Sequence, residues 1–207
     1  MIRIIKSLLP LFVVQFFTWL ALFSLWIYST PVVTRYIFQT TNSESPAFEN
    51  GVTWVGICFA LYATLAAFLA FLIPNLLKYI SKERLHSFAL LIGSFGLGSI
   101  AFIRDQYSLL VCFAFIGIAW SSISTVPYSI VGDKAPESHM ATYFTVFNFS
   151  VVIPQITAAF LLGYVNKHFF AGQTKDVILL GACSMFIAGV MMLFINKKTD
   201  ADEEIAF

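Results

Sequence analysis

Two side-chain amides in the middle of an apolar stretch are the first feature of this sequence that suggests chemistry. Asn148 and Gln155 stand seven residues apart in the segment 141–164, so on a helix they share a face, two turns apart. An amide in lipid is costly unless it pairs with a neighbouring helix or faces a wet cavity. We therefore expect the pair to point inward, either as interhelical hydrogen bonds or toward a path for a polar solute.

A second polar and aromatic group lies in the first apolar segment. At 100° per residue, Gln15, Trp19 and Trp26 fall within one sector, together with Thr18, Ser29 and Thr30. Indole rings stack on the apolar faces of sugars, and amides and hydroxyls bond to sugar hydroxyl groups. The pattern predicts a sugar-facing surface at Gln15 and Trp19. For Trp26, the alternative is an aromatic belt at the membrane interface, shared with Tyr28.

The apolar segment that ends near Tyr128 supplies further candidates. Trp120 and Ser124 share a side with Pro127 and Tyr128. The neighbouring Ser121 and Ser122 can instead bond back to a carbonyl one turn earlier. The predicted substrate-binding residues are therefore Gln15, Trp19, Trp120, Ser124, Asn148 and Gln155.

Composition identifies the environment of these residues. Of the 207 residues, 59% are hydrophobic and only 11% are charged, and the mean hydropathy is +0.84. A soluble domain carries roughly twice that charged fraction. The chain is therefore predicted to be a polytopic membrane protein in contact with a lipid bilayer. A net charge of +1 leaves no basic stripe for a nucleic acid partner.

The apolar residues divide into six stretches, each long enough to cross or nearly cross a bilayer. We expect an all-α protein with one six-helix transmembrane domain over residues 1–207. A short charged loop, 132–139, separates the fourth span from the fifth. The predicted spans are 8–36, 51–79, 87–103, 107–131, 141–164 and 177–195.

Basic residues predict the orientation of these spans. With six spans, both termini lie on one side of the membrane, and that side has eight Lys and Arg residues against four on the other. Cytoplasmic loops carry the excess of basic residues, so both termini are expected in the cytoplasm. The eight are Arg3, Lys6, Lys78, Lys82, Arg84, Lys134, Lys197 and Lys198.

Catalytic chemistry is not expected. The sequence has no metal-ligand cluster, no cofactor motif in a suitable context and no paired intramembrane carboxylates, and its three cysteines lie in apolar runs. No acidic residue, lysine or arginine falls in the middle of a span, and all three histidines lie near predicted helix ends. Proton relays normally use a buried titratable group. A proton-driven mechanism would therefore need a titrating residue outside this chain.

At these residues the sequence resembles a known family. The segments 126–128 (Val-Pro-Tyr) and 152–155 (Val-Ile-Pro-Gln), with Asp133, Pro136 and Asn148, resemble the carboxy-terminal half of major facilitator superfamily transporters. Within them, the chain is most similar to the glycoside–pentoside–hexuronide:cation symporters and to sucrose-transporter-like proteins. The opening segments 15–19 and 26–28 resemble the seventh helix of bacterial sugar transporters in that group.

The resemblance implies sugar or glycoside transport across the inner membrane, as proton-coupled symport. Family members have two six-helix halves with substrate bound between them, so a missing amino-terminal half is the implied partner. Asp133 is then a candidate gate residue at the cytoplasmic end of the fourth span. The competing hypothesis is a non-transporting membrane scaffold or assembly partner, whose polar residues would be paired between helices.

Overall fold

The computed structural model describes residues 2–204, and their side chains from residue 4 to residue 195. All regular elements in this part are helices, which confirms the predicted all-α class. They are α1 (Ile2–Tyr36), α2 (Pro46–Leu76), α3 (Lys82–Ser99), α4 (Gln106–Ile123), α5 (Val126–Lys134), the single 3₁₀ turn η1 (Glu137–His139), α6 (Met140–His168) and α7 (Thr174–Glu204).

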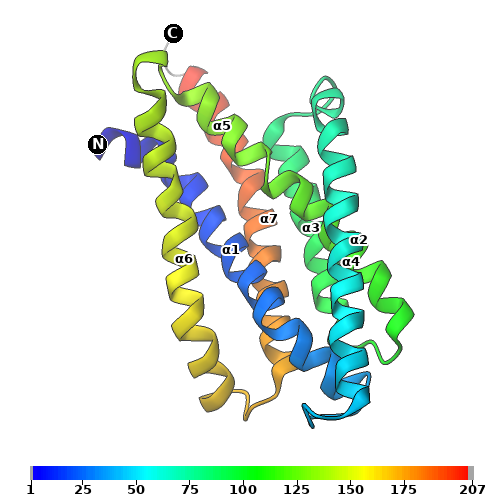
Figure 1. The fold of residues 1–207 in the computed structure, drawn as a ribbon. Coiled ribbons are helices and arrows are strands. Elements are labelled where there is room, and N and C mark those ends of the chain that lie inside the picture. Colours follow the sequence, from blue (N-terminus) through cyan, green and yellow to red (C-terminus); the bar gives the residue numbers. More distant parts are fainter. Residues whose placement is uncertain (1, 205–207) are drawn as a thin grey trace.

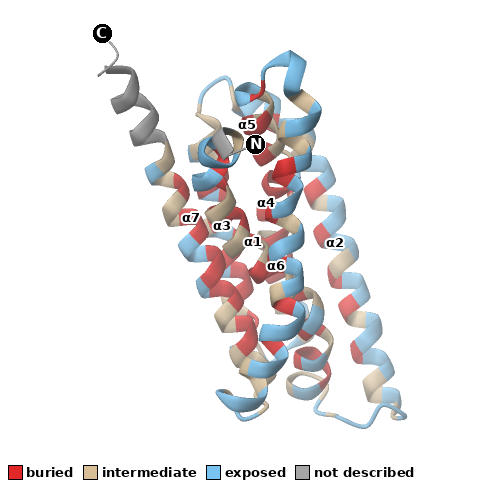
Figure 2. Cartoon of the chain, turned by 90° about the vertical axis from the view of Figure 1, so that its left-hand side faces the viewer, coloured by how far each residue is buried: buried red, intermediate tan, exposed pale blue. Residues whose placement is uncertain are grey.

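The helices pack together as one bundle. α1 packs against α7 and α6, α4 packs against α2 and α3, and α3 also packs against α7. In Figure 1, α6 and α2 lie at opposite sides of the bundle, and the turned view in Figure 2 places α7 and α2 on opposite faces. The start of α1 and the end of α7 lie at the same end of the bundle (Figure 1).

Five helical segments are long and apolar enough to cross a membrane: Ile4–Tyr36, Pro46–Leu76, Gln106–Lys134, Glu137–His168 and Thr174–Ile195. α3 is not among them. It has only 18 residues, and its first turn carries three charged side chains, Lys82, Glu83 and Arg84. The third predicted span therefore exists as a helix of the bundle, but it begins five residues earlier than expected and is less apolar than its neighbours.

The predicted fourth span, 107–131, is interrupted. α4 ends at Ile123 and α5 begins at Val126. The cause is local, because Pro127 has no N–H to continue the ladder and the preceding hydroxyls bond to nearby carbonyls. Thr125 Oγ1 donates to Ser121 O at 2.7 Å, and Ser124 Oγ donates to Trp120 O at 2.9 Å. The predicted span is confirmed as one apolar segment, Gln106–Lys134, that is long enough to cross a membrane, but the short break within it was not predicted.

Glycines allow α3 to approach its neighbours closely. A Cβ added at Gly93 would lie 2.3 Å from the Ala119 Cβ of α4, and one at Gly96 would lie 2.7 Å from the Cys112 carbonyl oxygen. Without a strong hydrophobic drive between helices in lipid, such close contact is a main source of association. The small residues of α3 therefore hold it in the bundle despite its charged first turn.

We expect Gly96→Ala to destabilise the protein by about 1–3 kcal/mol, because the new methyl group meets backbone rather than a side chain that can move. The matched control is Gly56→Ala on α2, where a Cβ would meet nothing within 4 Å, so that helix propensity alone should leave stability equal or higher. Thermal melting in detergent measures both. A Gly96→Ala protein as stable as the control would contradict the close α3–α4 packing.

Candidate functional site

Three tryptophan rings from two helices form one cluster. The ring centroids of Trp19 and Trp26 on α1 lie 6.1 Å apart, and those of Trp120 on α4 lie 6.1 Å from Trp19 and 5.8 Å from Trp26, all edge to face. The structure thus brings together two predicted site residues, Trp19 and Trp120. It also packs Trp26 against both of these rings.

Two rings that the sequence analysis did not select complete this aromatic cluster, which we define as Trp19, Phe23, Trp26, Tyr62 and Trp120. Tyr62 of α2 stacks on Trp120 with centroids 5.9 Å apart. Phe23 lies edge to face against Trp26 at 5.2 Å. Tyr62 could have been found from its spacing, because Val55, Cys58, Tyr62 and Ala66 form the buried stripe of α2.

Several buried polar atoms in or beside the cluster have no hydrogen-bond partner among the described residues. Gln15 is fully buried, one turn before Trp19, and neither its Oε1 nor its Nε2 has a hydrogen-bond partner among the described residues. The same holds for Trp19 Nε1 and the Tyr62 hydroxyl; the latter lies near Trp26 without the geometry of a hydrogen bond. Each such group costs about 1–3 kcal/mol. The cluster is therefore a polar site that the described chain alone leaves unsatisfied.

The two predicted amides of α6 are exposed rather than buried. Asn148 and Gln155 have no hydrogen-bond partner within the described part of the chain, so the structure contains no interhelical bond for either. They share a sector of α6 with Phe144, at spacings of four and eleven residues. Phe144 stacks on Tyr128 of α5, with centroids 6.3 Å apart. Both amides therefore lie on the side of α6 that faces α5.

Ser124 and Asp133 lie outside the cluster. Ser124 is exposed at the α4–α5 break, one turn after Trp120, and its hydroxyl is occupied by the Trp120 and Ser121 carbonyls. Asp133 lies near the end of α5 and forms an ion pair with Lys82 of α3. That pair joins the start of α3 to the end of α5.

Comparison with known proteins identifies the family. The model of the Major Facilitator Superfamily matches residues 1–158. The chain belongs to this superfamily. Sucrose transport protein SUT5 of Oryza sativa subsp. japonica is 25% identical over 209 residues, covering 88% of this chain and 39% of its own length. Proton-associated sugar transporter A of Homo sapiens is 29% identical over 137 residues, covering 62% of this chain and 18% of its own length. The chain thus spans about two fifths of the rice relative.

One buried residue of this major facilitator chain was missed. His86 is near a helix end, as expected, but it is fully buried. Its Nδ1 lies 2.8 Å from Ser122 Oγ on α4, so Ser122 does not bond back within its own helix. Ser121 does so, donating to Ile118 O at 2.7 Å. The inference that this chain holds no buried titratable group was wrong, because a position near a helix end does not ensure contact with water.

The exposure of Gln155 gives a test of its role. Gln155→Ala should leave the melting temperature unchanged, because no interhelical bond is lost. As a positive control, Ser87→Ala with Ser184→Ala removes two interhelical bonds, from Ser87 Oγ to Gly189 O at 2.6 Å and from Ser184 Oγ to Phe17 O at 2.7 Å. At about 0.6 kcal/mol each in membrane proteins, the double variant should lose about 1.2 kcal/mol. A Gln155→Ala loss of that size would instead make the amide an interhelical contact.

Proposed function

We propose that this chain forms the carboxy-terminal half of a transporter that moves a sugar or glycoside by proton-coupled symport. The observation that carries the proposal is the aromatic cluster with its unpaired polar groups. Trp19 and Trp120 supply indole rings, which can stack on a sugar, and the Gln15 amide has one acceptor atom and one donor group without partners among the described residues. The names of the rice and human relatives, which both refer to sugar transport, support the same substrate class.

The chemistry of the cluster favours a transporter over a membrane scaffold. A scaffold gains nothing from buried polar groups that lack partners, since each one lowers its stability. In a transporter the same groups are satisfied when the substrate or water is bound. We place Gln15, Trp19 and Trp120 at the centre of the half-site, with Asn148, Gln155 and Ser124 at its margins.

The partner in this proposal is an amino-terminal six-helix half. Family members bind substrate near the mid-membrane between two such halves, and α2 and α6 of this chain present many exposed apolar side chains, including Phe68, Phe71 and Phe160. These surfaces can meet either lipid or the other half. Asp133 and Lys82 would then form a gate contact on the cytoplasmic side.

The decisive experiment pairs transport with stability. In the complete transporter that contains this chain, Gln15→Leu should weaken apparent sugar affinity by roughly 1–3 kcal/mol, or about 5- to 150-fold, because the bonds to substrate are lost. The same change should leave stability equal or higher, because it removes two unpaired buried atoms. Trp19→Leu should lower affinity through lost stacking.

Radiolabelled sugar uptake and thermal melting measure the two effects. Phe160→Leu, at a 79% exposed position of α6, is the control for a change on the outside of the bundle. Unchanged uptake in both Gln15→Leu and Trp19→Leu would refute the proposed site. A Gln15→Leu protein that is less stable would mean that the amide has a structural role.

The orientation forms part of the same proposal: an inner-membrane protein with both termini in the cytoplasm. The excess of basic residues supports it, and the connection 77–81 lies at the same end of the bundle as the start of α1 (Figure 1). Reporter fusions at Ser45, Ser81 and Gln106 should read outside, inside and outside. An outside signal at Ser81 would overturn this topology.

A further inference from the structure

We propose that His86 is a protonation site that controls the contact between α3 and the α4–α5 break. This inference is independent of what the protein transports. It rests on the surroundings of a buried imidazole that the substrate site does not use. His86 is 0% exposed, and its hydrogen bond to Ser122 joins residues 36 positions apart on two helices.

The surroundings of His86 accept a neutral ring and disfavour a charged one. A neutral imidazole has one N–H donor, which Ser122 Oγ can accept, and its other nitrogen is only an unsatisfied acceptor. A protonated ring has two N–H donors, but Nε2 is buried without a partner among the described residues. Protonation in this arrangement would bury both a charge and an unpaired donor, which is costly.

No charged group among the described side chains offsets that cost. On α3, Lys82 is paired with Asp133 of α5, and Glu83 and Arg84 lie in the partly or fully exposed first turn. α4 presents the uncharged hydroxyl of Ser122, and burial of the imidazole disfavours its charged form. The stretch of α7 near the start of α3, marked by the bond from Ser87 to Gly189, has no ionisable side chain between residues 184 and 195.

Ser122 connects this imidazole to the helix break. Its carbonyl accepts the Thr125 backbone N–H at 3.2 Å, in the turn that separates α4 from α5. Two contacts therefore join the first turns of α3 to the region around the α4–α5 break. They are the hydrogen bond between His86 and Ser122 and the ion pair between Lys82 and Asp133. A change at His86 acts directly on the turn that sets the direction of α5.

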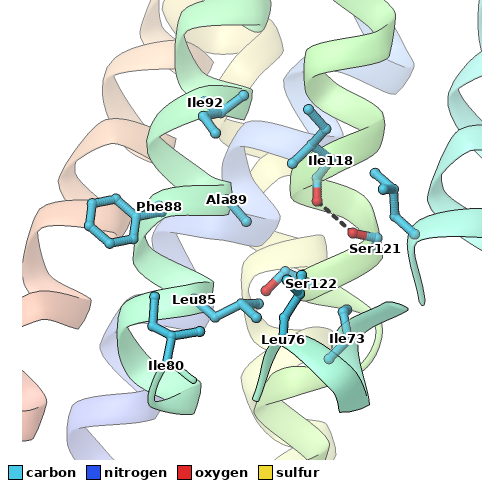
Figure 3. Close-up of a pocket in the computed structure, with 11 residues that line it drawn as sticks. Ile73, Leu76, Ile80, Leu85, Phe88, Ala89, Ile92, Ile118, Ser121 and Ser122 are labelled. Atoms are coloured by element: carbon cyan, nitrogen blue, oxygen red, sulfur yellow. Dashed lines mark hydrogen bonds between the residues drawn. The ribbon is translucent and has the colours of Figure 1, made fainter. Parts of the chain in front are cut away.

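Space for a rearrangement lies beside the contact. An open pocket of about 240 Å³ lies between α2, α3 and α4. Ser122 lies in its wall together with Leu85 and Ala89 of α3 (Figure 3), which are near His86 in sequence. The other lining side chains are apolar apart from Ser121, whose hydroxyl is bonded within its helix (Figure 3). α3 and α4 can therefore move apart here without breaking further polar contacts between them.

If the proton binds only the form in which α3 and α4 are apart, protonation favours that form. An unperturbed histidine titrates near pH 6.5. Below that pH, the population of the separated form relative to the closed form rises up to about tenfold for each unit by which the pH falls. Low pH should therefore open the α3–α4 contact, and neutral pH should close it.

Hydrogen–deuterium exchange of the purified chain in lipid nanodiscs tests this at pH 8 and pH 5.5, with times scaled for the intrinsic pH dependence of exchange. In the wild type, peptides covering 82–92 and 118–131 should lose up to about tenfold in protection at pH 5.5. His86→Gln, which can still bond to Ser122 and cannot take a proton, should remove that pH dependence. The exposed histidines provide matched controls, since His139→Gln and His168→Gln should behave as the wild type.

If the His86→Gln variant does not fold, a second measurement on the wild type still tests the proposal. In the wild type, NMR follows the Cε1–H groups of the three histidines separately. The signal of His86 should change only over the pH range in which protection is lost. Equal protection at both pH values, a pH dependence that persists in His86→Gln, or a His86 signal that changes without loss of protection would each overturn the proposal.

Discussion

The structure depends on one constraint: polar groups inside an apolar bundle must find partners within it. Most hydroxyls do so locally. Thr18 donates to Val14 O at 2.9 Å and Ser24 to Ala21 O at 2.7 Å, and these bonds add no link between helices. By contrast, the buried amide of Gln15 has no hydrogen-bond partner among the described residues, and we expect it to bond to a molecule outside this chain. Residues whose polar groups are paired inside the bundle stabilise it, and residues whose polar groups are unpaired are available to bind a ligand.

The same constraint explains why the helix break occurs where it does. Several hydroxyl residues precede Pro127, and their bonds to nearby carbonyls replace the ladder that the proline interrupts. Ser122, just before the break, bonds to His86 of α3, and α5, just after it, packs against α6.

The sequence predicted the all-α fold class from the length of its apolar segments, and it selected both Trp19 and Trp120 as candidates from helical spacing, because apolar length and helical spacing are local properties. It did not predict the break after Ile123, since proline is tolerated inside α1, α2 and α6 of the same chain. Tyr62 was missed although its spacing along α2 indicates burial. His86 was missed because its burial depends on which helices become neighbours, and spacing along one helix does not contain that information. The roles of Asn148, Gln155 and Asp133 remain predictions.

The aromatic cluster also has an optical consequence. Three of the four tryptophans lie within 6.1 Å of one another by ring centroid, while Trp54 is held apart by its bond to Gln106 O at 2.8 Å. Rings this close exchange excitation energy, so the ultraviolet emission of the chain comes largely from one place. The protein therefore contains a built-in fluorophore at its centre, and replacing Trp54 alone would isolate that signal.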